Sequence, residues 1–342
     1  MAALNGPGAM AMMPATLLDG GNWRMGMTRR LITVFGGSGF IGRHLVGRLA
    51  KQGHRIRAAV RRPNEALFLK PMGDVGQVQP IQANVRNRQS VARALEGADA
   101  AVNLVGILHQ AGRQRFATVQ AEGAGIIAEE AARAGVRHLV HVSAIGADAH
   151  GASKYAQSKA VGEALVKQAF PAATILRPSI VFGPEDGFFN RFAGLAKRLP
   201  VLPLIGGATR FQPVFVGDVA AAIARCLDGG PEVAGRSFEL GGPRVYSFEE
   251  LLRLMMDEIA VHRPLLPIPF SLAAIQAFFL QALPNPPLTV DQVRLLKHDN
   301  VVSDGAPSLA DLGIEPTPVE TVIPSYLVRF RPHGQFSTYR RT

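Results

Sequence analysis

The stretch Leu31-Ile-Thr-Val-Phe-Gly-Gly-Ser-Gly-Phe-Ile-Gly42 decides the fold of this chain. It begins as an apolar, β-branched run typical of a buried strand, and then changes to closely spaced glycines followed by apolar residues at helical spacing. Gly36 and Gly37 permit a tight turn, Gly39 lets the backbone approach a pyrophosphate, and Gly42 lets the new helix pack against the strand. The pattern predicts the strand–turn–helix start of a dinucleotide-binding fold, with the phosphates at the helix N-terminus.

Strand and helix signals alternate over the first half of the chain, which predicts an α/β fold with a doubly wound parallel sheet of the Rossmann type. The expected strands are Leu31–Phe35, Arg55–Val60, Gln77–Gln82, Ala100–Leu104, His138–Val142 and Ala173–Leu176, and the expected helices are Phe40–Gln52, Ser90–Glu96, Phe116–Ala134 and Lys154–Phe170.

After Ile180 glycine and proline interrupt this rhythm, and we expect a smaller C-terminal α/β lobe that covers the open side of the cofactor sheet. A strand at Phe211–Val216, a helix at Asp218–Leu227, a strand at Ser237–Leu240 and a helix at Phe248–Val261 are expected there. The expected organisation is a disordered leader (1–27), a dinucleotide-binding core (28–180), the remainder of the core with a substrate or docking lobe (181–330) and a basic tail (331–342).

The composition points to an anionic partner. The formal charge of +11 and the pI near 10.5 suit a nucleotide, an acidic protein or a lipid headgroup. The basic residues are scattered and no motif presents a helix to a DNA groove, so we expect no nucleic acid partner. The single cysteine, Cys226, excludes an intramolecular disulfide framework and suits a reducing compartment. The leader has neither a secretory nor a mitochondrial targeting pattern.

The end of the second strand favours NADP(H) over NAD(H). NAD-binding members of this fold place a carboxylate there for the ribose 2′-hydroxyl, whereas this chain has Arg61 and Arg62 and no acid before Glu65. A guanidinium can bind a 2′-phosphate through two hydrogen bonds. Asn84 after the third strand is a candidate for the adenine amino group and Asn103 for a position under the cofactor, although either can cap a local turn.

A second motif predicts proton-transfer chemistry. Tyr155 and Lys159 lie four residues apart and therefore share a helix face, where the ammonium is expected to lower the pKa of the phenol. Ser143 ends the fifth strand at the edge where ligands bind, and its hydroxyl can orient a carbonyl for hydride transfer.

With these residues in view, the chain resembles the extended short-chain dehydrogenase/reductase superfamily over residues 29–330. The motifs are Gly36-x-x-Gly39-x-x-Gly42, Asn103-x-x-Gly106, Ser143 and Tyr155-x-x-x-Lys159. Further segments are similar to the nucleotide-binding accessory subunit of respiratory complex I and its bacterial epimerase/dehydratase-type relatives: Lys159-Ala-Val-Gly-Glu163, Leu176-Arg-Pro-Ser179, Phe182-Gly-Pro-Glu-Asp186 and Phe211-Gln-Pro-Val214.

The resemblance implies a tightly held NADPH, a mainly structural role, and docking on complex I subunits at the cytoplasmic or matrix side of the membrane. Some related members are linked to ubiquinone biosynthesis. No metal site is implied. The catalytic set is Ser143, Tyr155 and Lys159, and the cofactor-binding set is Gly36, Gly37, Ser38, Gly39, Phe40, Ile41, Gly42, Arg61, Arg62, Asn84, Val85, Val105, Gly106, Tyr155, Lys159 and Pro178.

This chain differs from the superfamily pattern at Asn84, and it retains a complete catalytic set. Asn84 stands where the superfamily usually has an acid, which weakens the predicted adenine contact. The catalytic set is complete, although a structural subunit does not require it. The alternative function is therefore an active NAD(P)H-dependent reductase, epimerase or dehydratase that acts on a lipid-like carbonyl, with ubiquinone biosynthesis as one setting. A cofactor-sensing regulator is a third hypothesis.

The stretch from Leu265 to Val290 has no charged residue. Prolines bound an apolar helix that is too short to span a bilayer. A helix that is apolar on all sides must be buried, either within the lobe or against another surface. Arg294, Lys297 and the bases of the tail would then meet anionic headgroups, so peripheral contact with an anionic membrane surface is one hypothesis and a core helix is the other.

Overall fold

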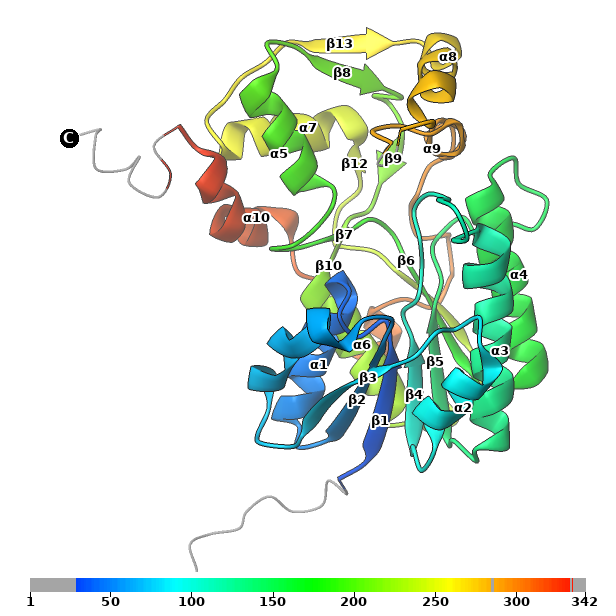
Figure 1. Ribbon diagram of the computed structural model, residues 1–342. Coiled ribbons are helices and arrows are strands. Elements are labelled where there is room, and N and C mark those ends of the chain that lie inside the picture. The colour runs from blue at the N-terminus through cyan, green and yellow to red at the C-terminus, as the bar shows by residue number, and fades with distance from the viewer. Residues whose placement is uncertain (1–28, 284–285, 333, 335–342) are drawn as a thin grey trace, which may run out of the picture.

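The computed structural model describes residues 29–283, 286–332 and 334. Its centre is a seven-stranded sheet in the order β11-β6-β5-β4-β1-β2-β3, with every neighbouring pair parallel (Figure 1). The predicted doubly wound α/β fold is confirmed. The strands are β1 Leu31–Phe35, β2 Arg55–Val60, β3 Val78–Gln82, β4 Ala100–Asn103, β5 His138–Val142, β6 Thr174–Pro178 and β11 Ser237–Leu240.

Helices cover both faces of this sheet (Figure 1). One face packs against α1 and α6 through Leu45, Val46, Val219 and Ile223, and the other packs against α2, α3 and α4. The strands alternate accordingly, so that Val34 faces the first layer while Phe35 faces the second. The helices are α1 Phe40–Lys51, α2 Arg88–Leu95, α3 Glu122–Arg133, α4 Lys154–Ala169 and α6 Val216–Leu227, with a 3₁₀ helix η1 at Pro63–Met72 and a π-helical turn η2 at Ala117–Ala121.

The strand order reverses between β1 and β4, because the chain goes from β1 outward through β2 and β3 and then returns to β4. Ligands of such sheets bind in the crevice outside the carboxyl ends of the strands at this point. The glycine turn after β1 and the ends of β2, β4 and β5 therefore lie around the expected cofactor position.

A smaller lobe stands over the carboxyl ends of the strands (Figure 1). Its main core joins α5, α7 and α10 through buried residues such as Phe189, Leu252 and Ile323. The short strands of this lobe form three two-stranded sheets. The elements are β7 Val181–Phe182, α5 Phe189–Arg198, β8 Leu202–Ile205, β9 Arg210–Phe211, β10 Val214–Phe215, β12 Tyr246–Ser247, α7 Phe248–Glu258, β13 Leu265–Ile268, α8 Phe270–Leu280, α9 Val290–Leu295, η3 Ala310–Leu312, α10 Val319–Leu327 and η4 Val328–Phe330.

The expected single strand at Phe211–Val216 is wrong. Residues Arg210–Phe211 pair with β12 in one small sheet, while Val214–Phe215 pair with β7 in another. Pro213 lies between the two segments and has no N–H to donate, so one continuous hydrogen-bonded ladder does not form. Hydrophobic periodicity detected the segment but not its division.

Of the two hypotheses for the apolar stretch, the core helix is wrong. The stretch divides into β13 and α8, and within α8 only Ala273 and Ala277 are buried. The large apolar side chains face outward, with Phe278 63% and Phe279 70% exposed. The helix packs on α9 through small alanines, which leaves its bulky side chains outside the core.

Two expected segments lie largely outside the described residues: the leader at 1–27 and, apart from residues 331, 332 and 334, the tail at 331–342. Across the described ranges, no helix combines the length and apolar character that crossing a bilayer requires.

Candidate functional site

The glycine turn after β1 has the geometry that its sequence requires. Gly36 adopts φ +80°, a conformation that favours glycine, and its N–H donates to the carbonyl of Ala59 at 3.0 Å. A Cβ on Gly42 would lie 2.4 Å from the Gly36 oxygen and 2.6 Å from the Gly37 oxygen. The sequence predicted that Gly42 packs against the strand. The atoms that exclude a side chain there are instead carbonyls of the turn itself.

The N-terminus of α1 is arranged for an anion. Gly39 is the N-cap residue, is exposed, and has no side chain to occupy the free N–H groups of the first turn. The first turn contains no acidic residue, so its positive dipole end is not neutralised locally. Ser38, Phe40 and Ile41 are partly exposed beside it. This end of α1 is where a pyrophosphate would bind.

The two predicted phosphate-binding arginines lie just beyond β2, and both are exposed. Arg62 forms an exposed ion pair with Glu65, its Nη1 lying 2.8 Å from Oε1. A pair of this kind contributes little stability in water and is readily exchanged.

The two predicted asparagines have local partners. The Oδ1 of Asn84 accepts from the N–H of Arg86 at 3.2 Å, which closes a turn next to the buried Val85. The Oδ1 of Asn103 accepts from the N–H of Val105 at 3.0 Å and thereby shapes the backbone that leads to the exposed Gly106. Both asparagines support the turns that line the crevice.

Ser143 and Lys159 lie together at the end of β5. The Nζ of Lys159 donates to the carbonyl oxygen of Val142, the residue before Ser143, at 3.2 Å. The Oγ of Ser143 is buried and has no hydrogen-bond partner within the described part of the chain. Pro178, the last residue of β6, is buried on the neighbouring strand, and its carbonyl accepts from Ile145 at 3.0 Å.

Tyr155 lies one turn before Lys159 on α4, and the Lys159 Nζ is 5.9 Å from the centroid of its ring. Phe116 packs edge-to-face on the same ring at a centroid distance of 5.8 Å. The structure therefore brings the three predicted catalytic residues into one region.

The predicted lowering of the Tyr155 pKa is wrong for this structure. Burial raises the pKa of Tyr155 to about 12. Burial also lowers the pKa of Lys159 to about 8, with Glu163 opposing that shift, so the charge expected to activate the phenol is itself destabilised. Sequence spacing placed both groups on one face but gave no measure of their loss of hydration.

His141 is a buried polar residue of this region that sequence reasoning missed. Its Nδ1 accepts from the Nδ2 of Asn103 at 3.0 Å, since an amide nitrogen can only donate. Burial, with Lys159 second, lowers the pKa of His141 to about 3, so the ring is neutral. A histidine alternating with apolar residues along a predicted buried strand was the available signal.

Asp291 of α9 joins the lobe to α4, the helix that carries Tyr155 and Lys159, and this contact was also missed. Its carboxylate accepts from the N–H groups of Lys154 and Tyr155 at 2.7 and 3.0 Å and from the Oγ of Ser153 at 2.8 Å. An acid at a helix N-terminus is stabilised by the helix dipole. Asp291 is 136 residues from Tyr155, so no local pattern could reveal the pair.

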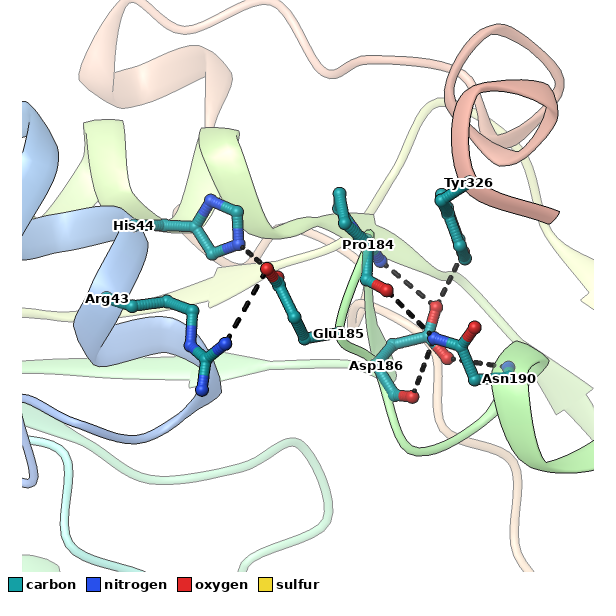
Figure 2. Close-up of polar contacts among 8 residues, drawn as sticks. Arg43, His44, Pro184, Glu185, Asp186, Asn190 and Tyr326 are labelled. Atoms are coloured by element: carbon teal, nitrogen blue, oxygen red, sulfur yellow. Dashed lines mark hydrogen bonds and ion pairs between the residues drawn. The ribbon is translucent and has the colours of Figure 1, made fainter. Parts of the chain in front are cut away.

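A second junction lies after β7, and Figure 2 shows it. The buried Asp186 accepts from the hydroxyl of Tyr326 on α10 at 2.5 Å and from the N–H groups of Phe188 and Asn190 at 3.0 and 3.2 Å. Its neighbour Glu185 contacts α1 instead. Two adjacent acids thus connect the cofactor helix on one side and the lobe on the other.

The comparisons with known proteins agree with this geometry. Residues 36–188 match a family model described as NAD(P)H-binding. The dTDP-glucose 4,6-dehydratase from Streptomyces venezuelae, solved with NAD and TYD bound, has the same fold, with a TM-score of 0.68 and 21% identity over 88% of this chain and 96% of that one.

Two curated proteins are similar over most of their length. NADH dehydrogenase (ubiquinone) 1 alpha subcomplex subunit 9, mitochondrial, from Arabidopsis thaliana is 35% identical over 316 residues, which is 88% of this chain and 78% of that protein. The NADH-ubiquinone oxidoreductase 40 kDa subunit, mitochondrial, from Neurospora crassa is 33% identical over 305 residues, or 89% of this chain and 80% of that protein. The chain therefore belongs to the NAD(P)H-binding family of these NADH-ubiquinone oxidoreductase subunits.

Proposed function

We propose that this chain is an NADP(H)-binding accessory or assembly subunit of respiratory complex I, in which the nucleotide is a structural ligand. The observation that carries the proposal is the extent of the relationship: it covers 88% of the chain and therefore includes the lobe as well as the cofactor half. A ligand that binds only the folded state stabilises it by mass action without turnover.

The preference for NADP(H) over NAD(H) is supported by charge. Arg61 and Arg62 are exposed beyond β2, and the nearest acid in the sequence, Glu65, is already paired with Arg62. A 2′-phosphate can displace such an exposed carboxylate because it carries more charge and offers bidentate acceptors.

The exposed side of α8 supports peripheral docking on complex I subunits and on an anionic membrane surface at the cytoplasmic or matrix side. Large exposed apolar patches mark interaction surfaces. Lys297 lies beside this helix, with its Nζ 5.7 Å from the centroid of the Phe270 ring. The patch, which we call the α8 patch, consists of Leu266, Leu272, Ile275, Phe278, Phe279 and Leu283.

An active NAD(P)H-dependent reductase, epimerase or dehydratase is the second candidate. It is favoured by the buried, unpartnered Oγ of Ser143 beside Lys159, because a hydroxyl without a partner suits the carbonyl oxygen of a substrate. Under this alternative Tyr155→Phe abolishes turnover and leaves NADPH binding intact.

The test is affinity purification of the full chain from gently solubilised membranes, with bound nucleotide and co-eluting proteins identified together. We expect NADPH that stays unoxidised, together with complex I subunits. Recovery of the nucleotide without any complex I subunit would refute the accessory role.

Two sets of variants separate the candidates in cells that lack the wild-type chain. Normal respiration with Tyr155→Phe and Lys159→Ala supports the structural role, and loss of respiration with both variants supports catalysis. In the α8 patch, Phe278→Ser with Phe279→Ser should reduce co-purification with membranes. The matched control is Leu67→Ser, an exposed apolar residue on η1 of the cofactor half, which should have no effect.

A further inference from the structure

Arg43 is an arginine of the cofactor region that the sequence motifs do not include. It lies one turn into α1, and side chains of an α-helix lean back toward its N-terminus. This geometry favours a guanidinium on the side of α1 nearest the expected nucleotide phosphates.

The position of Arg43 is fixed by the segment that follows β2. Its guanidinium carbon lies 4.9 Å from the centroid of the Phe68 ring, and Phe68 belongs to η1, which starts directly after Arg61 and Arg62. Because β2 is the sheet neighbour of β1, α1 and the end of β2 lie side by side. Arg43 and the loop that carries Arg61 and Arg62 therefore lie on neighbouring elements, at the corner of the crevice expected for the adenosine ribose.

The hydrogen bonding of Arg43 is incomplete. Its Nη1 lies 3.6 Å from the Oε1 of Glu185, which is an ion pair but not a hydrogen bond, and its buried Nε has no partner within the described residues. An arginine presents five donors in a planar fork, so this side chain has capacity for a further anion. Phe68 contacts the guanidinium through a cation–π interaction, and the Arg43 side chain remains 30% exposed.

Glu185 does not depend on Arg43 for a partner. Figure 2 shows it between the side chains of Arg43 and His44, and the His44 Nε2 lies 2.9 Å from its Oε2. If the guanidinium moved to another anion, the Glu185 carboxylate would still contact the His44 imidazole and would remain exposed to water. The exchange would leave no buried charge without a partner.

We propose that Arg43 is a specificity-determining residue that binds the adenosine 2′-phosphate together with Arg61 and Arg62, and that Glu185 holds its guanidinium when no phosphate is present. This inference rests on the proposed preference for NADP(H). It extends that preference from the loop after β2 to the helix that carries the glycine motif.

The experiment is calorimetric titration of the nucleotide-free full chain with NADPH and, separately, with NADH. Arg43→Gln should weaken NADPH binding by about 10-fold to 100-fold and change NADH binding by less than about 3-fold, since only NADPH carries the phosphate. Arg43→Lys should recover part of the loss, because it keeps the charge without the fork. Glu185→Gln should tighten NADPH binding a few-fold, because it removes the competing carboxylate.

The matched control is Arg48→Gln, which removes the same charge from an exposed position on the same helix and should leave the ratio of the two affinities unchanged. An equal effect of Arg48→Gln would show that net charge alone is responsible and would overturn the proposal. A loss of affinity for both nucleotides in equal measure with Arg43→Gln would also overturn it. Equal wild-type affinities for NADPH and NADH would refute the proposed cofactor preference instead.

Discussion

The cofactor half and the C-terminal lobe are built on different principles. In the cofactor half, parallel strands of four to six residues alternate with helices, and all strands except the edge strand β3 are largely buried between two helical layers. In the lobe, strands of two to four residues form separate two-stranded sheets, and distant carboxylates such as Asp186 and Asp291 join the parts. The difference teaches that local pattern specifies the first region and long-range contacts specify the second.

The largest expected effect is on the turn that begins the cofactor half. Gly42→Ala places a Cβ 2.4 Å from the backbone oxygen of Gly36, and backbone atoms cannot move away cheaply. We expect a loss of about 3 kcal/mol in the free energy of unfolding, together with loss of NAD(P)H binding, measured by urea denaturation and by titration.

Gly47→Ala is the control for this change, in the same helix. A Cβ at Gly47 meets only the Sδ of Met72 at 3.9 Å, so the helix should gain about 0.5–1 kcal/mol. If both variants lost stability equally, a general intolerance of added side chains on α1, rather than the clash with the turn, would explain the result.

Much of the cofactor half could be predicted from the sequence, because its signals are local. The bounds of β1, β2 and β5 are those predicted, since apolar runs of these lengths end at glycine or polar residues. The 3₁₀ helix η1 was not predicted: Pro63 and Pro71 break the helical pattern, and mainly contacts with α1 and β3 determine its form.

The site was predictable in position but not in electrostatics. The sequence placed Ser143, Tyr155 and Lys159 at one edge of the sheet, and the structure brings them into one region. The pKa shifts of Tyr155 and Lys159 come from burial, which depends on Phe116 and on packing between distant elements. Asp291 and Tyr326 could not be assigned at all, because their partners lie more than a hundred residues away.

In the lobe, Tyr326→Phe tests whether a single distant contact stabilises the region. The change leaves the buried Asp186 without its hydroxyl donor, and the loss of such a bond by a buried acceptor costs about 2 kcal/mol. Hydrogen exchange should accelerate in α5 and α10 but not in β1 or β4. Ser325→Ala, next to it and exposed, should change the free energy of unfolding by less than about 0.5 kcal/mol. Equal acceleration in both halves would contradict the division into two regions.

The dependence of stability on pH tests the burial of Lys159 in the site of the cofactor half. The pKa of Lys159 is about 8 in the folded chain against 10.5 for the free group, so between these values the unfolded chain binds more protons and stability rises with pH. Below pH 8 Lys159 is charged in both the folded and the unfolded chain, so the whole cost of burying its ammonium group lowers the free energy of unfolding. The shift of Tyr155 acts in the opposite direction, but only above pH 10.

We therefore expect the wild type to gain about 1–2 kcal/mol relative to Lys159→Met between pH 8 and 9.5, measured by urea denaturation at each pH. Groups that titrate in both proteins cancel when the free energy of unfolding of the variant is subtracted from that of the wild type. A constant difference over this range would mean that Lys159 is solvated and that its pKa is ordinary.

The smallest expected effect is in the α8 patch, where a large aromatic residue contributes little to folding. Phe278 is 63% exposed, so Phe278→Ser should change the free energy of unfolding by less than about 0.5 kcal/mol, whereas a buried phenylalanine truncated to alanine typically costs about 3–5 kcal/mol. Phe189 in the core of the same lobe is fully buried, and Phe189→Ala is the matched comparison. A large loss with Phe278→Ser in the isolated chain would show that this side chain stabilises the fold rather than an interface. A small loss, combined with reduced recovery from membranes, is the result expected of a residue selected for docking.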